Sequence, residues 1–275
     1  IVYSAAVLPE NPERVRAAEL GLPQMNYPTA LGEATKGKRL IAVVGTHGKT
    51  TTTAMIGQIL VDGGYDPTIV VGSIVPEWES NFRAGKGDIF VVEACEYRKH
   101  FLAFHPEVLV VTNIEWDHTD FYKTPKEFTA AFDEMKKQSR TVVEREHYKT
   151  ELVPELLIPG EFNKDNARAA KAGVKKLVPD ISDEVIDTAL AAYKGTWRRF
   201  EHKGTLPSGA ELYDDYAHHP TAIRKTIEAA RQKFPDKKIA VFFHPHLYSR
   251  TRDLFKDFAS ALASIDEVYI LPVYA

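Results

Sequence analysis

The sequence predicts an α/β fold, in which a mostly parallel sheet covered by helices is followed by a second, smaller α/β unit. Short apolar runs alternate along the chain with segments of helical periodicity, the pattern of a parallel sheet with helical crossovers. The chain has 275 residues, a length that indicates about two domains of ~100–200 residues each. Apolar residues make up 44% of the chain, which is enough to form a buried core.

Composition argues against several classes of function. The net charge is −3 and no stretch is rich in lysine and arginine, so we expect neither a nucleic-acid partner nor a membrane partner. No apolar run reaches the ~20 residues needed to span a bilayer, and the first residues lack the pattern of a secretion signal. The single cysteine, Cys95, fits a reducing compartment, and we expect a cytoplasmic protein.

The first part of the chain divides into a short leading segment and a central domain. Residues 1–36 contain one expected helix, 12–20, and too few apolar residues for a core, so we interpret them as the tail of an N-terminal domain. A central domain is predicted over 37–194. Its first predicted elements are strand 39–44, helix 50–63, strand 69–71, strand 88–93, a helix-like stretch through 101, strand 107–113 and helix 125–137.

The rest of the central domain is harder to interpret, and a second βα series follows it. Residues 138–161 have no clear period, whereas 163–177 and 182–192 are predicted helices. A Rossmann-like domain is predicted over 195–275, with strand 211–217, helix 220–233, strand 238–245, helix 252–263 and strand 268–273. Since the chain starts at isoleucine and stops just after a strand, we expect a fragment whose C-terminal domain is truncated.

A phosphate-binding loop is predicted at residues 43–53, VVGTHGKTTTT. A strand runs into Gly45, and Gly48, Lys49 and Thr50 begin the next helix. A helix N-terminus offers partial positive charge to phosphate, glycines allow close approach, and the lysine and threonine side chains can meet phosphate and Mg²⁺. This loop has two residues between its glycines, whereas the common form has four. A plain glycine turn before a helix is therefore the alternative.

Polar side chains follow two further strands of the predicted sheet. Glu93 ends one strand, and the stretch 113–120, NIEWDHTD, follows another and includes His118. The carboxyl ends of parallel strands meet at the sheet edge where α/β proteins bind ligands, so these groups converge on the predicted loop. Carboxylates and imidazole there suit a metal ion beside phosphate. Taken singly, each has a plainer alternative as a solvated charge or a structural histidine.

The second half of the chain carries further polar clusters. Asn163 and Asn166 share one helix face, although capping of that helix explains one of them equally well. Arg198 and Arg199 can bind phosphate or form a solvated pair. Two strand ends of the second unit, 213–219 (YDDYAHH) and 244–252 (HPHLYSRTR), combine acids, histidines and arginines, which indicates an anion pocket.

Together these motifs resemble the Mur ligases. GTHGKTTTT, EACEYRKHF, TNIEWDH, PGEFNKDN, RRFE, DDYAHHPTAI and HPHLYSRTRD occur in that family's order over nearly the whole chain, and the short glycine loop is normal there. The resemblance implies a P-loop central domain and an ATP-dependent, Mg²⁺-requiring enzyme of peptidoglycan synthesis that forms an amide through an acyl phosphate. His47 and the DDYAHHP and SRTR strings are typical of the member that joins L-alanine to UDP-N-acetylmuramate.

The resemblance also implies roles for individual residues. The groups expected to bind ATP are Gly45, Thr46, His47, Gly48, Lys49, Thr50, Thr51, Asn163, Asn166, Arg199 and Asp215. Thr50, Glu93 and His118 are expected to hold Mg²⁺, and the incoming alanine is expected near His219, Arg250 and Tyr216. Lys49, Glu93, His118 and Arg199 are the expected catalytic residues.

Two departures from the family pattern and two rival functions stay open. Leu247 stands where the family often has an arginine or another polar residue, and only about 45 residues separate His118 from Asn163. One rival is a relative that attaches a whole tripeptide during cell-wall recycling. The other is a P-loop switch that binds nucleotide without ligase chemistry. The partners expected are small molecules, and the sequence leaves the oligomeric state open.

Overall fold

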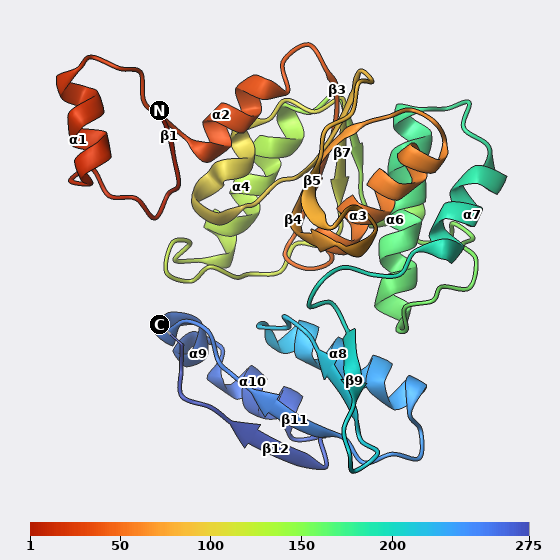
Figure 1. The fold of residues 1–275 in the computed structure, drawn as a ribbon. Coiled ribbons are helices and arrows are strands. Elements are labelled where there is room, and N and C mark those ends of the chain that lie inside the picture. The colour runs from red at the N-terminus through yellow and green to blue at the C-terminus, as the bar shows by residue number, and fades with distance from the viewer. Residues whose placement is uncertain (275) are drawn as a thin grey trace.

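The computed structural model describes residues 1–274, and a six-stranded sheet forms its centre (Figure 1). The strands lie in the order β5-β4-β6-β3-β7-β8, and all neighbours are parallel except β4 and β5. Their bounds are β3 Arg39–Val44, β4 Thr68–Val75, β5 Ser80–Arg83, β6 Ile89–Glu93, β7 Val108–Val111 and β8 Thr141–Val143. The predicted mostly parallel sheet is confirmed.

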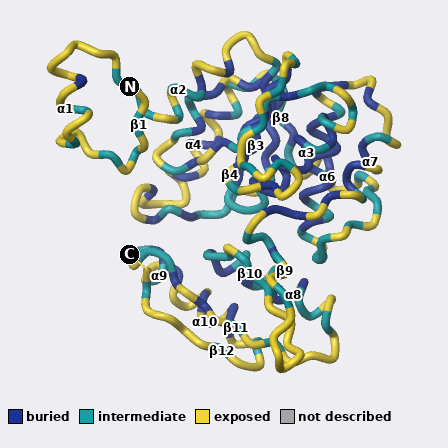
Figure 2. Tube along the Cα trace, viewed as in Figure 1, coloured by how far each residue is buried: buried dark blue, intermediate teal, exposed yellow. Residues whose placement is uncertain are grey.

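Helices cover both faces of this sheet, and each face has its own apolar core (Figure 2). Side chains alternate between faces along a strand, so Ile41 and Val43 of β3 join one core, and Leu40, Ala42 and Val44 join the other. The first core is covered by α3 (Lys49–Asp62), α6 (Glu161–Leu177) and α7 (Asp183–Ala192). The second is covered by α4 (Pro125–Lys137) and the 3₁₀ segment η2 (Tyr97–Ala103).

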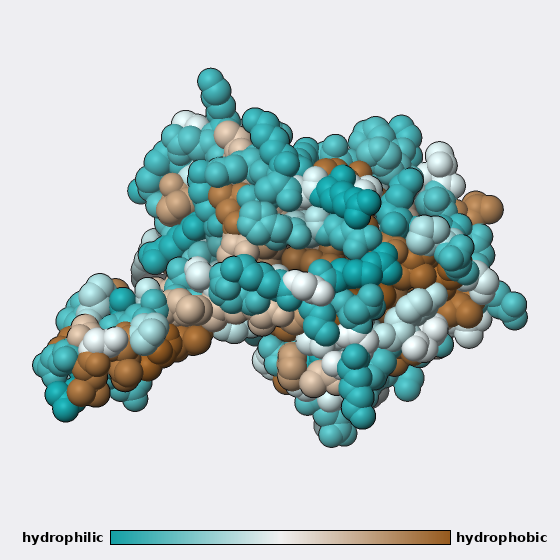
Figure 3. Space-filling model, turned by 90° about the horizontal axis from the view of Figure 1, so that it is seen from above, coloured by the Kyte–Doolittle hydropathy of each residue, from teal (hydrophilic) through white to brown (hydrophobic). Residues whose placement is uncertain are grey.

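The first part of the leading segment projects from the central domain, whereas its last helix packs against η2 (Figure 1). It contains β1 (Val2–Tyr3) and β2 (Met25–Asn26), which pair in parallel, together with α1 (Pro12–Glu19) and α2 (Tyr27–Ala34). Helix α1 confirms the expected one, whereas α2 was not predicted. Figure 3 shows apolar side chains gathered on this protruding lobe, where Ile1, Val2, Leu8, Leu20 and Leu22 are exposed.

The C-terminal unit lies below the central domain in Figure 1 and has a small core of its own. Its elements are β9 (Glu201–Thr205), β10 (Glu211–Asp214), α8 (Pro220–Lys233), β11 (Ala240–Phe243), α9 (Tyr248–Asp253), α10 (Phe255–Leu262) and β12 (Glu267–Ile270). Strands β11 and β12 are parallel. The predicted strand 211–217 is shorter and forms an antiparallel hairpin with β9, and the predicted helix 252–263 is broken near Leu254 between α9 and α10.

Two stretches differ from the pattern expected of the central domain. The unassigned segment 138–161 contains the edge strand β8 and a short helix, α5 (Arg145–Tyr148). The helix-like stretch through Phe101 is η2, a kinked 3₁₀ segment, because Arg98 and Lys99 both adopt positive φ. A three-residue 3₁₀ turn, η1 (Pro76–Trp78), joins β4 to β5. Within residues 1–274, no helix combines the length and apolar character required to cross a bilayer.

Candidate active site

A cavity of about 820 Å³ lies between the central sheet and the C-terminal unit. Strands β3, β6 and β7 are mutually parallel, so their carboxyl ends open on the same edge, and polar residues follow each of them there. Residues from both units line the cavity, among them Lys49, Glu93, His118, Arg199 and Arg250. Its volume is within the ~300–1,000 Å³ typical of small-molecule sites.

The predicted phosphate-binding loop joins β3 to α3. Gly45 and Gly48 have φ of 137° and 79°, which a residue with a side chain rarely adopts. A Cβ atom at Gly45 would lie 2.1 Å from the Thr112 hydroxyl, and one at Gly48 would lie 2.3 Å from Oδ1 of Asn166. Gly48 precedes helix α3 and provides no side-chain cap, so the helix N-terminus keeps the unpaired N–H groups that suit phosphate oxygens.

The segment after β7 fixes the outer part of this loop. Asn113 accepts the His47 N–H through Oδ1 at 3.0 Å and donates to the His47 carbonyl at 3.0 Å. The Thr112 hydroxyl donates to the same carbonyl at 2.6 Å. Thr46 donates its hydroxyl to the Glu115 carbonyl at 2.6 Å and accepts the Glu115 N–H at 2.9 Å. The loop is therefore held in place before it contacts any phosphate.

Lys49 is buried beside a carboxylate that the sequence did not single out. Its ammonium lies 3.0 Å from Oε1 and 2.9 Å from Oε2 of Glu96, and it also donates to the Gly45 carbonyl. Burial favours neutral lysine, but the carboxylates of Glu96 and Glu93 outweigh that effect and raise the Lys49 pKa. Burial likewise opposes ionisation of Glu96, yet Lys49 and His118 lower its pKa. Lys49 therefore presents a positive charge to the cavity.

Two of the three predicted magnesium ligands lie together. The Thr50 hydroxyl donates to Oε1 of Glu93 at 2.9 Å, and Oε2 of Glu93 accepts the Gly72 N–H at 2.6 Å. A hydroxyl and a carboxylate at the first turn of α3 are the oxygen ligands that Mg²⁺ takes beside phosphate. His118 points instead to Glu96, with Nε2 3.3 Å from Oε1. Thr50 and Glu93 thus fit the metal directly, and Glu96 connects His118 to Lys49.

The paired asparagines lie at the start of α6, against the loop. Both are buried, and the Asn166 amide donates to Oδ1 of Asn163 at 3.2 Å. The Asn163 amide donates to the Pro159 carbonyl at 2.7 Å and so secures the turn into the helix. Asn166 also packs on Gly48. Local structure therefore accounts for Asn163, whereas Asn166 lies beside the phosphate-binding loop.

Arg199 reaches the loop from the connection between the two units. Its Nη2 donates to the Thr50 hydroxyl at 3.1 Å. Arg198 and Phe200, on either side of it, both have positive φ, a conformation that costs about 1–3 kcal/mol each. Asp215 secures this turn by accepting the N–H of Phe200 at 2.8 Å. Burial raises the Asp215 pKa although Arg199 opposes the shift. The neighbouring arginine, Arg198, pairs with Asp214 at 2.9 Å.

Arg250 extends from α9 into the central domain. Its Nε and Nη2 donate to the two carboxylate oxygens of Asp117 at 2.7 and 3.3 Å, and both side chains are almost fully buried. Burial favours a neutral Asp117, but the Arg250 guanidinium outweighs it and holds the Asp117 pKa well below its usual range. Nearby, burial lowers the pKa of His218 to about 3, so that imidazole is neutral. Tyr216 is exposed and lies under the Arg198 and Arg199 guanidinium groups.

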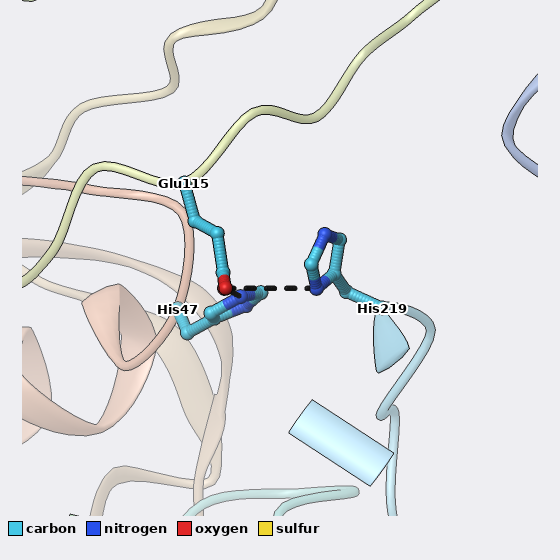
Figure 4. Close-up of side chains that lie close together, drawn as sticks. All are labelled: His47, Glu115 and His219. Carbon is cyan, nitrogen blue, oxygen red and sulfur yellow. Dashed lines mark hydrogen bonds and ion pairs between the residues drawn. The ribbon is translucent and has the colours of Figure 1, made fainter. Parts of the chain in front are cut away.

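His47 and His219 meet around Glu115 (Figure 4). Nε2 of His47 is 2.7 Å from Oε2 of Glu115, and Nδ1 of His219 is 3.7 Å from the same oxygen. Thr221 donates its hydroxyl to the other oxygen, Oε1, at 2.8 Å. The hydrogen bond from His47 is the main cause that lowers the Glu115 pKa to about 2. Glu115 therefore carries a negative charge between the two units.

Sequence reasoning brought most of these side chains to one edge but missed several contacts. Glu96 was overlooked because it follows the strand by three residues, in a stretch interpreted as helix. The repeat of acids in EACE was the available signal. No sequence signal pointed to Thr112 or Thr221, because a single threonine at a strand end or helix start commonly has a purely structural role. Glu115 and Asp117 were noticed only as members of a cluster, and their partners in the C-terminal unit lie more than 100 residues away.

Comparison with known proteins identifies the family. Residues 43–148 match the Mur ligase middle domain, and residues 198–273 match the Mur ligase, glutamate ligase domain. The whole chain is 40% identical to 71% of the UDP-N-acetylmuramate–L-alanine ligase of Desulfitobacterium hafniense, and 36% identical to 68% of the enzyme of that name from Arthrobacter. The first alignment has 320 positions against 275 residues here, so at least 45 of them have no counterpart in this chain.

Solved structures agree with this assignment. The UDP-N-acetylmuramate–alanine ligase of Thermotoga maritima superposes with a TM-score of 0.82 at 29% identity, over 99% of this chain and 71% of that one. A murein peptide ligase from Psychrobacter arcticus shares the fold, with a TM-score of 0.64 at 20% identity over 97% of this chain and 76% of its own. Two domain matches in the expected order and relatives above 30% identity over the whole chain lead to one conclusion: the chain belongs to the Mur ligase family.

Proposed function

We propose that this protein is an ATP-dependent ligase that joins L-alanine to UDP-N-acetylmuramate in peptidoglycan precursor synthesis. The single observation that carries the proposal is the convergence of the α3 loop and Lys49 on one cavity with Arg199, Arg250 and His219 of the C-terminal unit. The names of the relatives at 35–40% identity supply the substrates. We further propose domain limits of 1–36, 37–194 and 195–275, and a cytoplasmic location.

The first step is transfer of a phosphoryl group. An oxygen of the muramoyl carboxylate attacks the γ-phosphorus of ATP, the bond to the bridging oxygen breaks, and ADP leaves with that electron pair. Charge moves across the phosphoryl oxygens, so catalysis depends on positioned cations. Lys49 and Arg199 are such cations, and the N–H groups of Gly48, Lys49 and Thr50 at the helix N-terminus would hold the phosphates. When bound, Mg²⁺ neutralises phosphate charge, and Thr50 and Glu93 are its proposed ligands.

The second step forms the amide. The alanine nitrogen attacks the carbonyl carbon of the acyl phosphate, and phosphate departs with the electron pair of the C–O bond as the amine loses a proton. Arg250 presents a planar fork suited to the alanine carboxylate, in place of the Asp117 carboxylate that it now contacts. His219 and Tyr216 lie on the same side of the cavity. Near the nucleotide, we assign structural support of the site to Asn163, Asn166 and Asp215.

Closure of the two units over the cavity protects the intermediate. Water hydrolyses an acyl phosphate, so a ligase gains by enclosing it until the amine arrives. Groups from both units already touch, through Thr50 with Arg199 and Asp117 with Arg250. A switch that only binds nucleotide has no need for an arginine–histidine pocket on the second unit, which disfavours that rival. The tripeptide-adding rival is disfavoured by the names of the more similar relatives.

Phosphate release tests the proposal. With ATP and Mg²⁺ present, release should require both UDP-N-acetylmuramate and an amino acid, and alanine should outperform glycine, serine and a tripeptide. Discrimination over glycine rests on one methyl group, worth only ~1–3 kcal/mol in an apolar pocket, so the comparison should use kcat/KM. Equal release without an acceptor would favour the switch, and preference for the tripeptide would favour the recycling ligase.

A further inference from the structure

Three ligand-type side chains meet outside the predicted magnesium site. One nitrogen each of His47 and His219 and one carboxylate oxygen of Glu115 lie within 4.8 Å of one another (Figure 4). They come from the loop before α3, the segment after β7 and the residue before α8. Two belong to the central domain and one to the C-terminal unit, so the group forms only when the units are together.

We propose that His47, Glu115 and His219 form a site for a divalent transition-metal ion of the zinc class, separate from the magnesium site. Two imidazole nitrogens and one carboxylate oxygen are the ligands such ions select, whereas Mg²⁺ prefers oxygen alone. Catalytic zinc sites with this composition keep a fourth position open. Here that position faces the cavity, which all three residues line.

Both distances to Glu115 require only small side-chain movements. Ligands placed ~2.0–2.2 Å from a tetrahedral ion stand about 3.3–3.6 Å from one another. The His219–Glu115 separation of 3.7 Å already matches. The His47–Glu115 separation of 2.7 Å is a hydrogen bond, and an ion would replace its proton and spread the two groups by less than about 1 Å. Nδ1 of His219 would give up a long 3.3 Å contact with the Thr221 N–H.

The surroundings restrict all three residues, and contacts outside the ligands commonly support metal sites in proteins. Oε1 of Glu115 is held by the Thr221 hydroxyl, which leaves Oε2 for the ion. The backbone of His47 is held on both sides by Asn113. His219 has a side chain that is only 6% exposed, so its ring has little freedom to turn away. This support is independent of the residues proposed to bind Mg²⁺.

A bound ion would join the two units and occupy the amino-acid side of the cavity. His47 follows the loop glycine Gly45 by two residues, and His219 neighbours the α8 N-terminus, so one ion would fix both elements. A bound ion is therefore expected to stabilise the closed arrangement of the two units. Excess zinc should inhibit turnover because it prevents the units from opening, and not because it displaces Mg²⁺.

Direct metal binding tests this proposal in the whole protein. After treatment with a chelator, the protein is titrated with Zn²⁺ by calorimetry, and with Co²⁺ by visible absorption, in excess Mg²⁺ to fill oxygen sites. We expect one equivalent to bind, with the intense d–d bands of a four- or five-coordinate Co²⁺ ion, and a higher thermal transition with Zn²⁺. The isosteric Glu115→Gln and the variant His47→Asn should each weaken binding by more than the ~10–100-fold typical of an outer-shell partner.

Matched variants exclude other sites in the same cavity. Cys95→Ser and His246→Asn remove two of the other sulfur and nitrogen ligands that line it, and Glu93→Gln removes a proposed magnesium ligand; all three should bind Zn²⁺ like the parent protein. The proposal is overturned if the parent binds no Zn²⁺ in excess Mg²⁺, if Glu115→Gln binds it unchanged, or if Cys95→Ser or Glu93→Gln abolishes binding. Circular dichroism of each variant confirms that lost binding does not reflect unfolding.

Discussion

At the scale of single residues, the buried pair of Lys49 and Glu96 is central. Side-chain exposures of 13% and 2% leave little water to share their charges. Such a pair contributes little net stability over an apolar pair, but removing one partner leaves an uncompensated buried charge. The Glu96 carboxylate therefore keeps Lys49 charged and in place, and phosphate can later supply the same negative charge.

Glu96→Gln should consequently destabilise the central domain. The expected loss is about 3–5 kcal/mol, which corresponds to a fall of roughly 10 °C in its thermal transition. ATP with Mg²⁺ should recover more of that loss in the variant than it adds to the parent, because phosphate restores a partner for Lys49. Glu134→Gln, which breaks the exposed pair with Lys99, is the control and should change little. Equal transitions for both variants would contradict the prediction.

Arg250 and Asp117 call for a double-mutant cycle. Arg250→Gln and Asp117→Asn should each lower stability by about 3–5 kcal/mol, because each strands a buried charge, and the double variant should lose much less than the sum. KM for alanine should rise in both variants that lack Arg250, whatever their stability. Thermal unfolding and initial rates separate the two effects. If KM for alanine changed only in proportion to the loss of stability in all three variants, Arg250 would have no direct role in binding the amino acid.

Glu93 is tested by the metal it is proposed to hold. Glu93→Ala should raise the Mg²⁺ concentration that gives half-maximal rate by at least ~10-fold, since one charged oxygen ligand beside Thr50 is lost. Glu77→Ala, at an exposed acid, should leave the Mg²⁺ titration unchanged. If the titration of Glu93→Ala overlaid that of the parent, Glu93 would have no part in the metal site.

Residue types indicated many of the side chains that line the cavity, but not how those side chains pair. Lys49, Thr50 and Glu93 were singled out because each follows a strand or a glycine turn, and Arg199 because it is one of two adjacent arginines in a segment that resembles the family. Their partners depend on contacts between distant segments: Arg199 meets Thr50 across 149 residues. No local pattern encodes such a separation, and this is why Glu96 and Thr221 were not foreseen.

At the scale of elements, the loop before α3 is shaped by what packs on it. Gly48 combines φ of 79° with an approach to Asn166 that leaves no room for a Cβ atom. Helix α6 therefore presses directly on the phosphate-binding loop. A side chain at this position would cost stability in two ways, through backbone strain at positive φ and through the clash with Asn166. A second glycine of the chain, Gly64, allows the two costs to be separated.

Gly48→Ala should be compared with Gly64→Ala. Gly64 has the same φ of 79°, but no atom lies within 4 Å of the position that a Cβ atom would take there, so its alanine measures backbone strain alone, about 1–2 kcal/mol. Gly48→Ala should cost clearly more and should also weaken ATP binding, because α6 or the loop must move. Chemical denaturation and nucleotide titration measure the two quantities. Equal destabilisation by the two variants would mean that the Asn166 side chain can move away from the new Cβ atom without a loss of stability.

Elements with strong boundary signals were predicted closely. Helices α4 and α8 begin at Pro125 and Pro220 as expected, each after a residue whose side chain caps the first turn. The missed or altered elements lacked such signals. Strand β5 has only four residues and a mixed burial pattern, and η2 is bent by positive φ at Arg98 and Lys99, which no periodicity reveals.

At the scale of the whole molecule, a few polar contacts join the two units across the cavity. Asp117 with Arg250 and Glu115 with Thr221 are the hydrogen bonds that carboxylates make between the units, and Glu115 also lies 3.7 Å from Nδ1 of His219. Relative motion of two units is the default expectation unless their interface is large and apolar. The closed arrangement should therefore be easy to shift.

Removing both carboxylate links should open the molecule. The double variant Asp117→Ala with Thr221→Val should show a larger radius of gyration in small-angle scattering than the parent. Asp183→Ala with Thr205→Val, which alters contacts within single units, is the control and should match the parent. Identical scattering from both double variants would show that the connection alone sets the domain arrangement.

The connection between the two units also contains a tryptophan, Trp197, whose fluorescence can report on domain movement. Trp197 directly precedes the turn with two positive φ values, is 45% exposed, and has its backbone bonded to Ile74 and Ser73 of β4. The Arg198 guanidinium lies 5.7 Å from its ring. Any change in this turn that lets the units separate must change the environment of the Trp197 indole. With Trp78 and Trp116 replaced by phenylalanine, the intrinsic fluorescence of Trp197 would therefore measure the rates of opening and closing without an attached dye.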